Sequence, residues 1–100
     1  MRAVISSRAV ISSRAVISSR AVISSRVAEQ LAAAPDPIPR AFFKQLGYLL
    51  RDLHHPSLNA KKYPEGGPDI WQARITKAWR FYFKIEGDAY LITNATDHPK

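Results

Sequence analysis

The side chains best suited to chemistry lie in the last third of the chain, where polar and apolar residues alternate. Successive side chains of a β-strand point to opposite faces of its sheet. If residues 71–76 and 79–85 are strands, one face carries mostly apolar side chains and the other carries Arg74, Arg80, Tyr82 and Lys84. Cations bind phosphates, and tyrosine can stack on an unpaired base, although such residues also serve as solvated charges or partners of carboxylates.

Histidine is the other residue type that can move protons near neutral pH. The chain has three histidines and no cysteine, so neither a disulfide nor a thiolate can form. His54 and His55 follow a predicted helix, where they interact favourably with the helix dipole, and we do not expect them to bind a metal. His98 stands near the carboxyl end. We expect no metal and no other cofactor.

Two helices are predicted ahead of these strands. Apolar residues recur at helical spacing over residues 27–34, preceded by serines that can cap the first turn and followed by a proline. The same spacing returns over residues 38–53. A polar loop that contains Lys61 and Lys62 then runs to about Asp69.

Three strands follow, over residues 71–76, 79–85 and 89–95, with a hairpin turn at Gly87 and Asp88. An antiparallel meander with two helices on its apolar face leaves the other face open. With one strand before the first helix, the pattern predicts an α+β domain of order β-α-α-β-β-β and an antiparallel sheet.

That first strand comes from a repeat, because residues 2–25 are the hexapeptide RAVISS written four times. On an α-helix a period of six spreads the apolar side chains round the whole cylinder, whereas an even period keeps each residue type on one face of a strand. A β-helix coil of about 18 residues would use most of the tract. We therefore interpret each copy as one short strand, in preference to a disordered or aggregating tail or a solenoid.

The repeat also supplies most of the positive charge. The formal net charge is +7, and five of the 15 basic residues are the arginines at positions 2, 8, 14, 20 and 26. Residues 27–100 hold ten basic and eight acidic residues, which leaves +2. An argument for nucleic-acid binding must therefore rest on where the charges lie. Because no run of 18 apolar residues occurs, we expect a cytoplasmic protein with no membrane partner.

The order of these elements resembles the RelE/ParE superfamily of toxins from bacterial toxin–antitoxin pairs. The resemblance covers residues 20–100. It rests on a strand followed at once by SRVAEQL (residues 25–31), the pair of predicted helices and the loop that contains Lys61 and Lys62. It rests further on WQARIT (residues 71–76), WRFYF (residues 79–83) and a histidine near the carboxyl end, His98. It implies that the fourth repeat copy, residues 20–25, fills the place of the first strand. Residues 1–19 are then a surplus extension that arose by duplication, ahead of a toxin domain at 20–100.

Two activities occur in this superfamily. RelE-like members cut messenger RNA on the ribosome without a metal, and ParE-like members inhibit DNA gyrase and cleave nothing. Under the RelE-like activity, the resemblance implies catalytic roles for His98, Arg80 and Arg74. RNA contacts are expected for Lys61, Lys62, Tyr82 and Lys84.

We expect a RelE-like mRNA endoribonuclease that inhibits translation, with a cognate antitoxin, the ribosome and mRNA as its partners. A ParE-like inhibitor that binds DNA gyrase and an inactive toxin remnant are the alternatives. Two features depart from the RelE-like pattern. Residues 57–62 lack the glutamate that some of these toxins carry there, and Pro99 and Lys100 stand where an aromatic residue often follows the histidine.

Overall fold

A computed structural model describes residues 20–97 of the chain. Its helices are α1 (Ser25–Ala33), α2 (Ile38–Arg51) and a short 3₁₀ helix at Pro64–Gly66. Its strands are β1 (Arg20–Ile23), β2 (Lys61–Lys62), β3 (Trp71–Arg74), β4 (Trp79–Glu86) and β5 (Ala89–Asp97). The predictions for residues 1–19 and for His98 lie outside the described residues.

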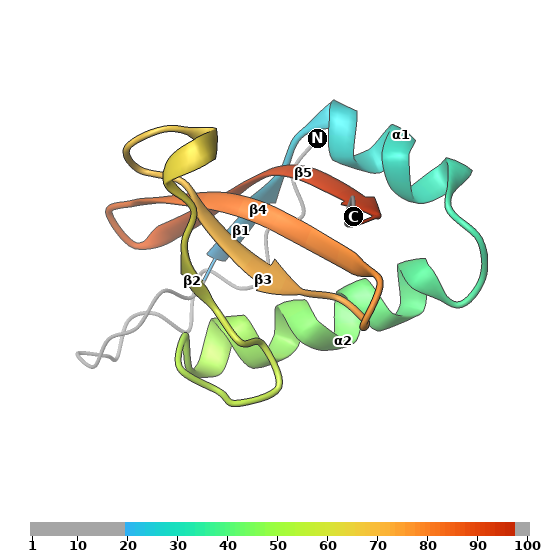
Figure 1. Ribbon diagram of the computed structural model, residues 1–100, viewed down its shortest axis with the longest axis horizontal. Coiled ribbons are helices and arrows are strands. Elements are labelled where there is room, and N and C mark those ends of the chain that lie inside the picture. The colour runs from blue at the N-terminus through green and yellow to red at the C-terminus, as the bar shows by residue number, and fades with distance from the viewer. Residues whose placement is uncertain (1–19, 98–100) are drawn as a thin grey trace.

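The five strands form one sheet in the order β1-β5-β4-β3-β2 (Figure 1). Strands β2 to β5 pair antiparallel, whereas β1 runs parallel to β5, with Arg20 beside Ala89 and Ile23 beside Ile92. The predicted α+β class is confirmed, but the sheet is mixed and not purely antiparallel. β1 and β5 are far apart along the chain, so no tight hairpin forces them to run antiparallel.

Strand β2 is the element that the sequence pattern did not indicate. It consists of Lys61 and Lys62, both exposed, which pair with Gln72 and Trp71 of β3. Two exposed lysines show no alternation of apolar and polar residues, and this alternation is the signal by which a half-buried strand is recognised. The segment predicted as loop therefore adds an edge strand next to β3.

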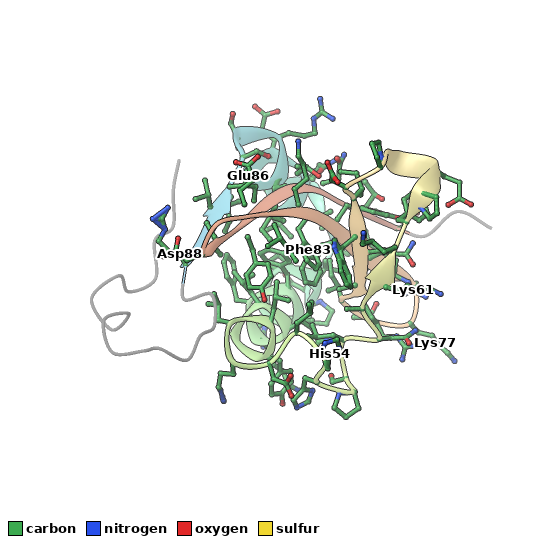
Figure 2. All side chains as sticks on the ribbon, turned by 90° about the vertical axis from the view of Figure 1, so that its left-hand side faces the viewer. His54, Lys61, Lys77, Phe83, Glu86 and Asp88 are labelled. Atoms are coloured by element: carbon green, nitrogen blue, oxygen red, sulfur yellow. The ribbon has the colours of Figure 1, made fainter. Side chains whose placement is uncertain are left out.

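One hydrophobic core joins the sheet to both helices. α1 contributes Val27 and Leu31, and α2 contributes Phe42 and Leu46. The ring of Phe42 packs edge-on against that of Phe81, with centroids 5.3 Å apart. The strands add further inward side chains, namely Ala21, Ile23, Ala73, Phe81, Phe83, Ile92 and Ala95. Phe83 points from the sheet toward α2 (Figure 2). The apolar face predicted for β3 and β4 is thus the covered face.

Polar side chains complete the junction between β1 and α1. The Ser24 side chain accepts a hydrogen bond from the backbone N–H of Val27 at 3.2 Å, which confirms a serine cap on α1. Beyond Ile92, β5 has no backbone partner from β1, and the backbone N–H of Ala95 donates instead to Oε1 of Gln30 at 2.8 Å.

No helix within residues 20–97 has the length and apolar character needed to cross a bilayer.

Candidate nucleic-acid interface

The face of the sheet opposite the core carries polar residues in rows that cross the strands. One row contains Arg74, Arg80 and Thr96. The next contains Lys61, Gln72, Tyr82 and Asn94. Lys84, opposite Leu91, begins a third row. Successive rows are two residues apart along a strand, which is about 7 Å. The four residues predicted to share this face, Arg74, Arg80, Tyr82 and Lys84, therefore do so.

Arg74 and Arg80 are directly opposite each other on β3 and β4. Like charges at such a position repel each other and destabilise the pairing of the strands. Within residues 20–97 neither guanidinium pairs with a carboxylate, and Nε of Arg74 is buried without a hydrogen-bond partner. An anion bound beside these two residues would relieve the repulsion and accept from the guanidinium Nη groups that make no hydrogen bond within residues 20–97. The pair is therefore suited to a phosphate.

The guanidinium of Arg80 is held over the turn between β3 and β4. Its Nη1 donates to the backbone oxygens of Thr76, Lys77 and Trp79 at 2.9, 3.1 and 3.2 Å. A guanidinium carries five N–H donors, so the Nε and Nη2 donors remain for a ligand. Arg80 therefore stabilises the turn and presents its charge in a fixed position.

Arg74 is held through its backbone by a buried residue that the sequence analysis missed. Gln45 of α2 is 5% exposed, and its Nε2 donates to the oxygens of Arg74 at 2.8 Å and Ser57 at 2.9 Å. Its Oε1 accepts from the Ser57 hydroxyl at 2.9 Å, while the N–H of Arg74 donates to the oxygen of Leu58 at 2.8 Å. An available signal was the place of Gln45 on the buried stripe of α2, four residues before Leu49.

A hollow of about 200 Å³ opens on this face next to Thr96, the residue that pairs with Arg80. Two tyrosines form part of its wall, with the ring centroids of Tyr63 and Tyr82 5.0 Å apart and their planes tilted by 55°. Thr93, Asn94 and Thr96 of β5 also line it. The nearby Tyr82 phenol, together with partial burial and Glu65, raises the pKa of Tyr63 above its usual value.

The lysines predicted to contact RNA are divided between two places. Lys61 belongs to the row of Tyr82, whereas Lys62 pairs with Trp71 and places its Nζ 5.5 Å from the centre of the indole ring. Lys62 and Lys84 line a second hollow, of about 150 Å³, together with the acidic residues Asp69 and Glu86. Lys84 is four residues from Arg80 along β4, about 13 Å. The structure thus does not gather the predicted cations into one cluster.

The two described histidines lie at the end of α2. His54 is exposed, and its backbone N–H donates to Oδ1 of Asp52. The ring of His55 stacks on Tyr48 with centroids 3.9 Å apart, and its Nδ1 accepts a hydrogen bond from the backbone N–H of Ser57 at 3.1 Å. His55 therefore organises the loop that Gln45 also contacts. Within residues 20–97 no three histidine, aspartate or glutamate side chains form a group that could hold a metal ion.

The comparison with protein-family models finds no match, and neither does that with curated proteins. Solved structures do match. The YoeB/ParE toxin from Agrobacterium tumefaciens superposes with a TM-score of 0.66 at 12% identity, over 79% of this chain and 98% of that one. A chain of the archaeal RelE-RelB complex from Pyrococcus horikoshii gives 0.66 at 17% identity, over 81% and 96%.

YafQ from E. coli gives a TM-score of 0.60 at 13% identity, over 78% of this chain and 91% of that one. At these identities the likeness concerns the path of the backbone. It spans nearly the whole length of each of these toxin structures. The fold that the resemblance implied is therefore confirmed: this chain has the fold of the YoeB/ParE, RelE and YafQ structures.

Proposed function

We propose that this protein is the toxin of a toxin–antitoxin pair and that it acts as a RelE-like, ribosome-dependent endoribonuclease on messenger RNA. The toxin role is supported by the fold shared with the YoeB/ParE, RelE and YafQ structures. The nuclease role rests on one observation, the opposed Arg74 and Arg80 without carboxylate partners in residues 20–97, on the same face as the hollow of Tyr63 and Tyr82. A single RNA strand supplies phosphates for the first feature and bases for the second.

The reaction needs no metal if the 2′-hydroxyl of the RNA attacks its own 3′-phosphate. A bond forms between that oxygen and phosphorus, the bond to the 5′-oxygen of the next nucleotide breaks, and the products are a 2′,3′-cyclic phosphate and a 5′-hydroxyl. One group must take the attacking proton, one must protonate the leaving oxygen, and cations must stabilise the charge on the phosphate. We assign the cationic role to Arg74 and Arg80 and a proton-transfer role to His98.

The proposal includes the partners of the protein. The P. horikoshii structure is a complex of RelE with RelB, which supports a cognate antitoxin for this chain as well. An mRNA cut on the ribosome makes the ribosome the second partner and the cytoplasm the place of action. Lys61, in the row of Tyr82, is placed to contact the RNA backbone, and Lys84 would reach it further along the same face, whereas Lys62 is in the row of Trp71 and Phe83.

The test is induction of the protein in growing cells, followed by mapping of mRNA ends and of the chemical groups on them. We expect new ends that carry a cyclic phosphate and a 5′-hydroxyl, and we expect them to disappear with His98→Ala and with Arg74→Ala. Lys44→Ala, an exposed cation on α2, is the matched control and leaves the ends unchanged. Intact messages together with an induced SOS response would refute the nuclease and favour gyrase inhibition.

A further inference from the structure

The wall of the hollow next to Thr96 is shaped by an irregularity in the sheet. The register between β4 and β5 shifts at Tyr82 and Phe83, so that Tyr82 pairs with Asn94, Phe83 pairs with Ile92, and Thr93 is the extra residue. A β-bulge redirects side chains and occurs often beside functional sites. Here it allows two consecutive residues, Thr93 and Asn94, to line the same hollow.

Three polar side chains of β5 line the hollow, and two of them have no hydrogen-bond partner within residues 20–97. The Thr93 hydroxyl donates to the backbone oxygen of Tyr82 at 3.3 Å. Within residues 20–97 the side-chain amide of Asn94 and the hydroxyl of Thr96 have no hydrogen-bond partner. An amide presents one acceptor and two donors side by side, which is the arrangement that pairs with two adjacent atoms of a base edge.

The aromatic groups supply the other half of a base site. The tilted rings of Tyr63 and Tyr82 form an angular wall, and Ile70 adds an apolar surface to it. The side-chain Nε2 of Gln72 donates a long hydrogen bond, of 3.5 Å, to the Tyr82 hydroxyl at the outer end of the ring. A tyrosine whose ring is held in place loses little freedom when a base stacks on it.

The hollow lies one row of side chains away from Arg80. Tyr82 and Asn94 are in the row next to that of Arg80 and Thr96, and adjacent rows are about 7 Å apart. That spacing is comparable to the reach from a nucleobase across its ribose to its own phosphate. One nucleotide can therefore occupy both sites at once.

We propose that the hollow between Tyr63 and Tyr82 binds an unpaired nucleobase of the RNA, stacked on Tyr82, and that Asn94 discriminates between bases by hydrogen bonding to the base edge. The inference rests on the proposed function, because it names the part of the substrate that this face recognises. It makes Asn94 a specificity-determining residue and leaves the arginine pair as the phosphate contact common to all sequences.

The test separates binding from cleavage by using RNA trinucleotides with 2′-O-methyl riboses, which cannot be cut by their own 2′-oxygen. Their central position carries each of the four bases or no base at all, and binding to the full-length protein is followed by NMR. We expect the best base to bind about tenfold more tightly than the abasic probe. The largest shifts should occur at Asn94 and Thr96.

Two variants and one control show which residues cause the dependence of binding on the base. Tyr82→Leu, which keeps an apolar side chain without a stacking ring, should remove the difference between base and abasic probes. Asn94→Ala should keep that difference but reduce the ratio between the best and the worst base, by about tenfold. Phe43→Ala, which removes an aromatic ring that is 52% exposed on α2, should change neither quantity.

The unaltered protein alone can overturn the inference. Equal affinity for base-containing and abasic probes would refute it, even if mRNA is still cleaved. Base-dependent binding that disappears with Tyr82→Leu, in a protein that leaves messages intact, would uphold the base site and refute the nuclease. Base-dependent binding that survives both Tyr82→Leu and Asn94→Ala would place the base elsewhere and refute the assignment to this hollow.

Discussion

Replacing Gln45 with methionine is the most informative single change in the core. Methionine has nearly the same length and volume, so it can occupy the same position on the buried face of α2. The change removes the Nε2 donor shared by the backbone oxygens of Ser57 and Arg74, and the Oε1 acceptor of the Ser57 hydroxyl. The change in stability therefore reports the loss of these three hydrogen bonds, with little contribution from a change in side-chain shape.

The cost can be worked from those contacts. A net loss of about 1 kcal/mol for each of three hydrogen bonds gives about 3 kcal/mol, and leaving a buried oxygen unpaired acts in the same direction. Ser57 is only partly buried, so water can replace part of its bonding. We expect the free energy of unfolding to fall by about 2 to 3 kcal/mol.

Urea denaturation measures this change, and the slope of unfolding free energy against urea should stay constant if only stability changes. Lys44→Ala, at the exposed neighbouring position, is the control and should cost under about 0.5 kcal/mol. Because Gln45 holds the backbone of Arg74, RNA affinity should fall in Gln45→Met under conditions where the protein is still folded. A loss of stability below about 0.5 kcal/mol, or unchanged RNA affinity, would refute this account of how Arg74 is held.

Three further predictions concern separate parts of the chain. Deleting residues 2–19 should leave the melting temperature and the toxicity unchanged, because β1 is retained; loss of soluble protein would show that the repeat is structural. Ser24→Ala should lower the free energy of unfolding by about 1 kcal/mol through loss of the α1 cap, and an unchanged urea midpoint would contradict this. Lys61→Ala should weaken binding of single-stranded RNA more than Lys84→Ala does, because Asp69 and Glu86 lie around Lys84; the reverse order would contradict the position assigned to the RNA.

Local periodicity was enough to predict the two faces of the sheet. In β3 and β4 the alternation that places Phe81 and Phe83 inward places Arg80 and Tyr82 outward, and the structure agrees. Side-chain direction along a strand follows from backbone geometry within a few residues, so it can be read without knowledge of the neighbouring strands. For the same reason the helical stripe of α2 was recognisable from its spacing.

Contacts between distant parts of the chain decided the rest. β1 pairs in parallel with β5, and Gln45 donates a hydrogen bond to the backbone of Arg74; both contacts join residues separated by tens of positions. The bulge at Thr93 exists only in relation to the neighbouring strand β4. No local pattern encodes them. Identical neighbours such as Lys61 and Lys62 are also equivalent in the sequence, and pairing with β3 sends them to different faces.

The sequence by itself therefore determined which residues are outward and available for chemistry, because strand geometry is local. The tertiary structure decided which of them meet. It set Arg74 opposite Arg80 and placed Asn94 beside Tyr82, because the register between strands is chosen by packing of the whole core and not by any one segment.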